Sequence, residues 1–308
     1  MLPQNLFQRV APIVRPAVQS FASPTEVQAR NVATLKTLSL RMRSIKNMQK
    51  ITKAMKMVAA AKMRKDERAM QLGLPFSQPA AALFQRLGQT EGTGSMTILP
   101  ITSDKGLCGG VNSAVNKQVR LLTNEEEAKG NTVKIAIMGG KGVAGLKRLY
   151  GDRFSISFED LAKAPWSFGA ASIIADKVLA SNPGRLKIIS NQFKSMVAYE
   201  TEPTDVITRS QATAMDRAEW SKAMDVYSFE PSIYEVFDDL QEFYTGCVIF
   251  GAQLQSSITE TSQRMSAMEN ASKNAGEMYE KVSLQFNRAR QAKITTELCE
   301  IISGASAV

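Results

Sequence analysis

The first long segment of the chain, residues 33–70, carries apolar side chains at helical spacing. They step by three or four positions and share one face of a helix: Ile45, Met48, Ile51, Met55 and Val58. The opposite face is basic, with Arg43, Lys46, Lys50 and Lys53. Because residues 33–72 contain no Pro or Gly, and the first ones to follow are Gly73 and Pro75, the pattern predicts one helix to about residue 70. A helical stretch over 78–88 is expected to follow.

The middle of the chain, residues 95–208, has short apolar runs in alternation with helical stretches. Strands are expected at 97–102, 133–138, 154–158 and 185–190, and helices at 112–129, 143–150 and 167–180. This alternation is typical of βαβ units and a mostly parallel, Rossmann-like sheet. A further strand over 193–206 contains Pro203, which favours an edge position.

The last part of the chain, residues 230–308, is again helical. A seam with three- and four-residue steps begins at Ile258 and ends at Ala289; between them lie Thr261, Met265, Met268, Ser272, Ala275, Tyr279, Val282 and Phe286. Such a heptad seam indicates a coiled-coil partner. The helix over 33–90 is the economical partner, since the domain between them returns the chain. The predicted fold class is therefore α/β, a long antiparallel coiled coil of terminal helices with a central Rossmann-like domain over 95–208. This architecture suits a shaft or spacer better than an enzyme with a pocket.

The net charge of +9 is concentrated in the first helix. Residues 33–68 hold eleven Lys or Arg and only two acids, which accounts for the whole excess. A basic stripe of this kind indicates an acidic partner, which could be nucleic acid, anionic lipid or an acidic protein surface. No apolar run reaches the length of a membrane span.

Residue usage argues against several kinds of site. Histidine is absent, which excludes Ser-His-Asp and Cys-His nucleophiles and imidazole metal ligands. The three cysteines, Cys108, Cys247 and Cys299, form no CxxC pair. We therefore expect no catalytic residue, no cofactor-binding residue and no metal ligand in this chain.

Residues 1–32 have the composition of an organellar import presequence. They carry three arginines, several Ser and Gln, and one acid, Glu26. Arg30 stands three residues before Ala33, a spacing seen at matrix-protease cleavage sites. We expect the mature chain to begin near Ala33.

Two glycine-rich turns keep another kind of function open. Residues 140–145, GKGVAG, match GxGxxG after a predicted strand, with Glu159 and Asp160 about where a ribose-binding acid would stand. The turn over 103–112 lacks the GxxxxGK[ST] pattern of a phosphate-binding loop and is expected to end in a helix cap at Asn112 or Ser113. A Rossmann dinucleotide-binding protein is one alternative reading, and a basic nucleic-acid-binding coiled coil is another. The basic helix lacks interleaved aromatic residues and any nucleic-acid-binding signature.

The end of the chain is unusually apolar. Residues 288–308 read RARQAKITTELCEIISGASAV and finish on small and apolar residues, where most chains end in polar ones. A long helix with such an end needs a dry environment for its tip.

Four blocks of the sequence resemble one family. They are ATLKTLSLRMRSIKNMQKITKAMKMVAAAKMRK (33–65), TSDKGLCGGVN (102–112), RMSAMENASK (264–273) and ITTELCEIISGASA (294–307). In this order they resemble the gamma subunit of the rotary, proton-translocating ATP synthase, over essentially all of residues 33–308.

The resemblance implies a function as a central stalk. The terminal helices would form a coiled coil inside a hexamer of alpha and beta subunits, and the α/β domain would sit against small stalk subunits (delta or epsilon) and the c-ring. Proton-driven rotation of ring and stalk would force the beta subunits through different nucleotide affinities. The chain would be a non-catalytic rotor subunit, peripheral to the mitochondrial inner membrane on its matrix side, without nucleic acid or cofactor.

The resemblance also assigns interface residues. Met55, Lys53 and Lys56 would meet the acidic lever of beta. Arg264, the first residue of the block 264–273, would also belong to the interface with the alpha/beta hexamer. Arg290 and Gln291 would contact the catching loops of the hexamer, with Thr295 and Glu297 nearby. Leu298, Ile301 and Ile302 would fill the apolar bearing.

Overall fold

The computed structural model describes residues 34–87, 95–161, 164–215, 222–230 and 232–306. The presequence predicted over 1–32 lies outside these residues. By its internal contacts the chain divides into two units, one built from residues up to Ile45 together with those from Met278 onward, and one from Lys46–Glu277. Each unit is described by itself.

The centre of the larger unit is a five-stranded sheet. Its strands are β1 (Met96–Pro100), β2 (Val133–Met138), β3 (Phe154–Phe158), β4 (Arg185–Phe193) and β5 (Tyr199–Val206), in the order β3-β2-β1-β4-β5. All neighbours are parallel except β4 and β5, which pair antiparallel. The predicted strands are confirmed, and β5, the strand that contains Pro203, is an edge strand as expected.

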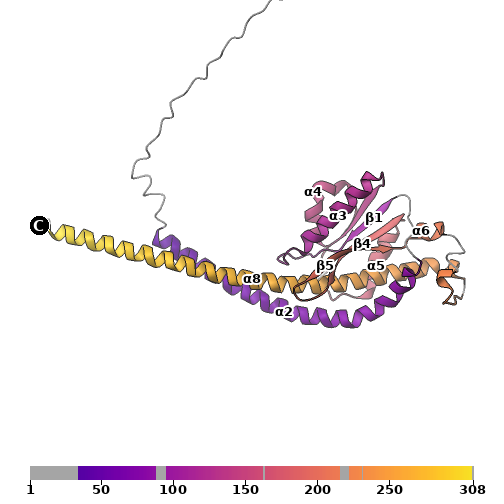
Figure 1. Ribbon diagram of the computed structural model, residues 1–308, viewed down its shortest axis with the longest axis horizontal. Helices are drawn as coiled ribbons and strands as arrows, with labels where there is room; N and C mark the ends of the chain where they lie inside the picture. Colours follow the sequence, from indigo (N-terminus) through magenta and orange to yellow (C-terminus); the bar gives the residue numbers. More distant parts are fainter. Residues whose placement is uncertain (1–33, 88–94, 162–163, 216–221, 231, 307–308) are drawn as a thin grey trace, which may run out of the picture. The chain divides into compact units, whose positions relative to one another are not determined.

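Helices cover both faces of the sheet (Figure 1). On one face, α3 (Val111–Ala128) and α4 (Gly140–Tyr150) enclose a core that includes Ile98, Val115, Ile135 and Leu146. On the other, α5 (Phe168–Leu179) packs together with parts of the two long helices over residues such as Leu99, Ile174 and Ile188. Short elements η1 (Gly151–Arg153) and α6 (Arg209–Ala214) complete the described folded segments.

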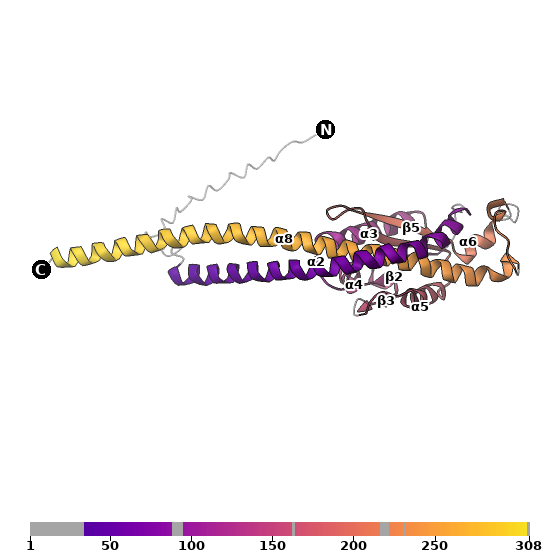
Figure 2. The same ribbon diagram turned by 90° about the horizontal axis from the view of Figure 1, so that it is seen from below.

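The long helices are α2 (Leu35–Gln85) and α8 (Ile233–Ser306). In the larger unit they run antiparallel and side by side, since Lys56 pairs with Glu269 while Asp66, further along α2, accepts from Ser257 (Figure 2). The predicted seam on α8 is confirmed, because every one of its residues from Ile258 to Ala289 is buried or half-buried.

The prediction that α2 is interrupted at Gly73 and Pro75 is wrong. The helix continues through Pro75 and Pro79 to Gln85. Each proline inside a helix costs about 3 kcal/mol, but aromatic packing around this turn outweighs that cost. Phe76 lies 5.1 Å from Phe168 between ring centroids, and Phe84 stacks on Tyr244 at 4.0 Å.

The apolar face predicted on α2 is buried only in part, at Ile45. Buried positions recur every seven residues, at Leu38, Ile45, Thr52 and Ala59, whereas Met48, Ile51 and Val58 are exposed. The facing stretch of α8 includes small residues at Ser272, Ala275 and Gly276, and a Cβ on Gly276 would lie 3.2 Å from Gln49. Such a close approach selects small side chains for the seam, so the larger apolar residues remain on the outside.

Candidate functional site: two exposed surfaces on the long helices

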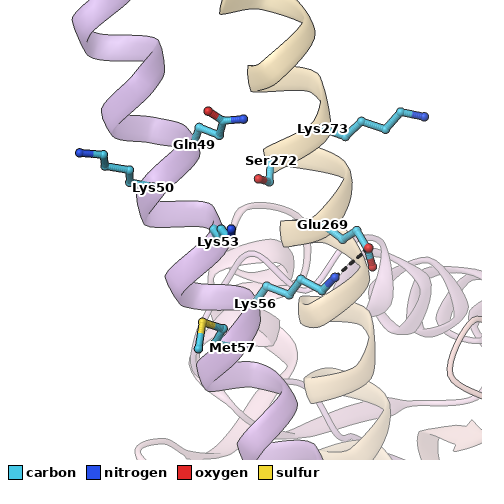
Figure 3. Close-up of a pocket in the computed structure, with 8 residues that line it drawn as sticks. All are labelled: Gln49, Lys50, Lys53, Lys56, Met57, Glu269, Ser272 and Lys273. Carbon is cyan, nitrogen blue, oxygen red and sulfur yellow. Dashed lines mark hydrogen bonds and ion pairs between the residues drawn. The ribbon is translucent and has the colours of Figure 1, made fainter.

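A groove lined by lysines lies between α2 and α8 in the larger unit (Figure 3). We call it the lysine groove; its volume is about 780 Å³, and it is lined by Gln49, Lys50, Lys53, Lys56, Met57, Glu269, Ser272 and Lys273. Lys56 Nζ donates to Glu269 Oε1 at 2.7 Å. Among the residues that the structure describes, Lys50, Lys53 and Lys273 have no ion-pair partner. The groove therefore presents an excess of positive charge beside an exposed apolar side chain, Met57.

Two of the predicted interface residues, Lys53 and Lys56, lie in this groove. Met55 does not line it and is half-buried. Its neighbour Met57, which the sequence reasoning did not select, lines the groove and is exposed. Three lysines at helical spacing marked this face in the sequence, but the register of α2 against α8 decided which methionine lies beside them.

The second surface is the last four turns of α8, in the smaller unit. Every described residue from Arg290 to Ser306 is exposed. Four large apolar side chains form one stripe, which we call the terminal stripe: Ile294, Leu298, Ile301 and Ile302, each more than half exposed. Leu298 follows Ile294 by four positions and precedes Ile301 and Ile302 by three and four, so they share one side of the helix. An apolar helix face of this size in contact with water is typical of a surface made for a partner.

The other predicted residues of this end surround the stripe. Arg290 and Gln291 are exposed, and Thr295 Oγ1 donates to the Gln291 carbonyl at 3.0 Å. Lys293 stands four positions after Ala289, where a continued seam would require a small or apolar residue. Its side chain is exposed and its ammonium lies 3.5 Å from the carboxylate of Glu297. The seam of α8 ends before it, so its ammonium needs no buried partner.

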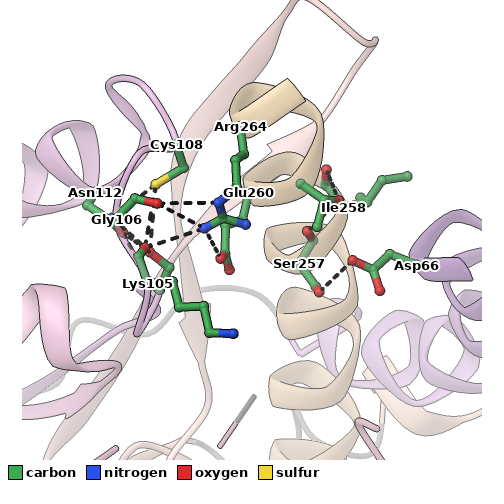
Figure 4. Close-up of polar contacts among 11 residues, drawn as sticks. Asp66, Lys105, Gly106, Cys108, Asn112, Ser257, Ile258, Glu260 and Arg264 are labelled. Carbon is green, nitrogen blue, oxygen red and sulfur yellow. Dashed lines mark hydrogen bonds and ion pairs between the residues drawn. The ribbon is translucent and has the colours of Figure 1, made fainter. Parts of the chain in front are cut away.

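Arg264 lies away from both surfaces along α8 and is largely buried. Its guanidinium donates to the carbonyl of Gly106 through Nε and NH2, at 3.3 and 3.2 Å, and to Glu260 at 2.5 Å (Figure 4). It thereby fastens the loop after β1 to α8. That loop exposes a large apolar side chain, Leu107, whose φ of 65° is unusual for a branched side chain. The described contacts of Arg264 are within this chain, and the loop it holds carries the exposed Leu107.

The β4–β5 hairpin is held against the same stretch of α8. Ser262 Oγ donates to the Met196 carbonyl at 2.7 Å, and Gln263 Nε2 donates to the Val197 carbonyl at 3.2 Å. Met196 and Val197 are exposed, as Leu107 is. The sequence reasoning missed these loop tips because no local pattern shows that a distant helix supports them.

The GxGxxG turn is occupied by the chain's own side chains. Asp104 Oδ1 accepts from the Gly140 N–H at 3.0 Å, and Thr102 Oγ1 accepts from the Gly142 N–H at 2.9 Å. These amides at the start of α4 are the ones that a pyrophosphate would need. A Cβ on Gly142 would lie 2.7 Å from Thr102 Oγ1 and 2.9 Å from Ile137, so the glycine is required for packing. The turn is structural.

The turn over 103–112 is also internally satisfied, although not by the predicted cap. The N-cap of α3 is Gly110, without a side-chain cap. Asn112 instead accepts from the Ser103 N–H at 3.0 Å and contacts Cys108 Sγ at 3.2 Å. The side chain of Asn112 therefore closes the loop, and the prediction that it or Ser113 caps the helix is wrong.

Within the described ranges, no group of three or more acidic or thiol side chains is placed to hold a metal ion. Among the same residues, no helix combines the length and the apolar character that crossing a bilayer requires.

Comparison with known proteins identifies the family. The family model described as ATP synthase matches residues 34–308. The mitochondrial ATP synthase F(1) complex subunit gamma of Rattus norvegicus is 40% identical over 280 residues, which cover 90% of this chain and 100% of that protein. The mitochondrial ATP synthase subunit gamma of Drosophila melanogaster is 39% identical, over 91% and 93% of the two chains.

Solved structures agree with this. A chain from the central stalk and c-ring of Tetrahymena thermophila mitochondrial ATP synthase is 28% identical, with a TM-score of 0.56 over 72% of this chain and 99% of that one. A chain of the Euglena gracilis mitochondrial ATP synthase, 19% identical, shares the fold, with a TM-score of 0.71 over 89% and 94%. Neither a dinucleotide-binding protein nor a nucleic-acid-binding coiled coil is favoured by these relatives or by the occupied turn. The chain belongs to the ATP synthase family, among its gamma subunits.

Proposed function

We propose that this chain is the rotor shaft of an ATP synthase. In this role it couples proton-driven rotation of a membrane c-ring to conformational cycling of catalytic beta subunits. Its partners are the alpha and beta subunits, the c-ring and small central-stalk subunits (delta or epsilon). The chain makes and breaks no bond itself; it acts by contacting the beta conformations differently and so shifting their populations.

The observation that carries this proposal is the terminal stripe. The last four turns of the helix are exposed and carry four large apolar side chains on one face, so covering them with another surface would be stabilising. Burying each such side chain is worth about 1.5–3 kcal/mol. A ring of subunits around the helix would supply a dry sleeve, in which Leu298, Ile301 and Ile302 serve as the bearing.

The lysine groove supports the same proposal. Lys50, Lys53 and Lys273 offer positive charge to an acidic lever of a beta subunit. Met57 in the groove, and Met55, which is half-buried outside it, would provide adaptable apolar contact. Arg290 and Gln291, with Thr295 and Glu297, would hydrogen-bond to loops at the top of the hexamer. Arg264 would act on the interface through the loop that carries Leu107.

We also propose a location on the matrix side of the mitochondrial inner membrane. The relatives from Rattus norvegicus and Drosophila melanogaster are mitochondrial, and residues 1–32 have the composition of an import presequence. Attachment would be peripheral, through the c-ring.

The test is purification of tagged chain from gently solubilised mitochondria, with mass spectrometry and an ATPase assay of the eluate. We expect alpha and beta subunits with nucleotide hydrolysis. A chain that elutes alone, or with nucleic acid or a dinucleotide, would overturn the proposal. The matched variant ends the chain at Glu297 and removes most of the stripe; its complexes should hydrolyse ATP without proton-coupled synthesis, or fail to assemble.

A further inference from the structure

The two edges of the sheet are built differently. The β5 edge carries Glu200, Glu202 and Asp205 together with Pro203, which has no N–H to offer. Charges and proline are the usual means by which an edge strand avoids pairing with another chain. The β3 edge, Phe154–Phe158, reads FSISF and has neither charge nor proline within the strand. One edge is protected and the other is not.

The open side of β3 presents its own main chain. The Gly139 N–H donates to the Phe158 carbonyl at 2.8 Å, so the polar main-chain groups of Phe158 point toward β2. Because these groups alternate in direction along a strand, the N–H and C=O of Ser157 point away from β2. The Ser157 side chain is exposed as well, while Ile156 and Phe158 are half-buried. A donor and an acceptor are thus available at this edge.

A cavity lies at the beginning of β2 and β3. Its volume is about 570 Å³, and Asn131, Thr132, Lys134, Asp152, Phe154 and Ser155 are among its lining residues. Arg153, which also lines it, is engaged by Glu127 and stacks over Tyr150. The cavity lies beside the residues that lead into β3, at the end of the edge that carries Asp152.

The two ends of the edge carry acids. Asp152 precedes β3 and Glu159 follows it, and both are exposed. In the described part of the chain neither has an ion-pair partner. A second copy of β3 would bring acid against acid in either strand direction, because both ends are negative. The occupant must therefore be basic at both ends and uncharged between them.

We propose that the β3 edge binds an extended segment of another subunit, which adds to the sheet as a sixth strand. The segment spans about seven residues, with Lys or Arg near each end to meet Asp152 and Glu159, and alternating apolar side chains beside Ile156 and Phe158. This inference rests on the proposed function in one respect: the chain works within a complex of several subunits.

The test is amide hydrogen exchange at Ser157, compared between the isolated chain and the purified complex. We expect exchange to be at least about tenfold slower in the complex. An equal rate in both states would overturn the inference. Exchange over residues 294–302 is followed in the same samples, since protection there reports the proposed function independently. Without protection at either place, both proposals fail.

Variants identify the partner segment. Ser157→Pro removes the outward N–H and leaves the β2 ladder intact, whereas Ser157→Ala keeps the N–H and is the matched control. The proline variant should lose one subunit from the complex, or protection of one segment in that subunit, and the alanine variant should lose neither. If the proline variant does not fold, Asp152→Lys with Glu159→Lys makes the same test through charge. The added strand would be contradicted if the folded proline variant, or the double charge reversal, gave a complex with the same subunits and the same protection as wild type.

Discussion

Lys56 of α2 and Glu269 of α8 form an ion pair at 2.7 Å across the lysine groove, on two exposed side chains. The pair neutralises one of the four lysines that line the groove. The remaining three, Lys50, Lys53 and Lys273, are the ones whose charge an acidic partner can use. An exposed pair of this kind contributes only about 0–1 kcal/mol to stability.

Reversal of the free charges should therefore affect assembly and leave the fold intact. We expect Lys50→Glu with Lys53→Glu to weaken association with the catalytic subunits about ten- to hundredfold at low ionic strength, and less at high ionic strength. The yield of assembled complex at two salt concentrations measures this. Lys56→Gln is the control, because its charge is already paired. Equal losses for the control and the double variant would show that the groove charge is not what the partner reads.

Polar substitutions in the terminal stripe should leave the stability of the isolated chain unchanged and impair the assembled complex, whereas in a buried core they would destabilise the chain itself. Leu298→Asp and Ile302→Asp should change the free energy of unfolding of the isolated chain by less than about 0.5 kcal/mol, because both side chains are exposed. In the complex they should abolish coupled ATP synthesis, since a carboxylate would enter an apolar bearing. Thermal unfolding and synthesis rates in the same preparations measure the two effects. Glu300→Gln, at the same end of α8, is expected to keep both; equal synthesis in all three variants would contradict a bearing.

Gly142→Val separates a structural glycine from one that binds a nucleotide. The added side chain would collide with Thr102 and Ile137, so we expect a loss of about 2–4 kcal/mol in the free energy of unfolding. Gly169→Ala is the matched change, since nothing lies within 4 Å of a Cβ there, and it should be neutral or slightly stabilising. Chemical denaturation measures both. Wild-type chain that binds a dinucleotide, with Gly142→Val folded but unable to bind it, would instead support the Rossmann reading.

Arg264 can be tested through the loop it holds. Lysine has one nitrogen centre and cannot reproduce the forked contacts to Gly106 and Glu260. We expect Arg264→Lys to cost about 1–3 kcal/mol in stability and to speed amide exchange over residues 106–110. Arg288→Lys, exposed on the same helix, should do neither. Unchanged exchange in Arg264→Lys would show that the loop holds its shape without this anchor.

The alternation of short apolar runs predicted the strands closely, because buried parallel strands leave a strong local signal. The edge position of β5 followed from Pro203 alone. Two features of α2 were not predictable in this way. Its passage through Pro75 is accompanied by packing of Phe76 on Phe168, which is far away in the sequence. The use of Thr52 and Ala59 in its seam depends on the close approach of α8 at small residues such as Gly276. Local hydrophobicity predicted that Met48 and Ile51 would be buried in the seam, but both side chains are exposed. In both cases a tertiary contact outweighed the local preference.

The candidate surfaces also differ in whether local sequence or a tertiary contact determines them. The terminal stripe was evident from the sequence because a helix period and an apolar composition coincide there. The loop tips at Leu107 and Val197 were not evident, since their position depends on Ser262, Gln263 and Arg264 of a helix more than 60 residues away.

The buried ion pair between Glu126 and Arg185 should make stability depend on pH in a defined window. Burial acts to raise the pKa of Glu126, but hydrogen bonds from Arg185, Asn131 and Lys129 outweigh it, so the pKa lies below the ordinary 4.5. The unfolded chain therefore binds a proton at higher pH than the folded chain does. The stabilisation is fully present above about pH 4.5 and is lost as the pH falls through the folded-state value.

Glu126→Gln removes this dependence. At neutral pH the variant should be less stable by about 2–3 kcal/mol, because Arg185 loses its buried counter-charge. The difference should shrink below pH 4.5, since wild type then loses the contribution that the variant never had. Urea unfolding at several pH values between neutrality and pH 3 measures the two curves. Glu125→Gln, one residue earlier and exposed, should follow wild type throughout; a gap between wild type and Glu126→Gln that stays constant with pH would mean that the lowered pKa is not the source of the stabilisation.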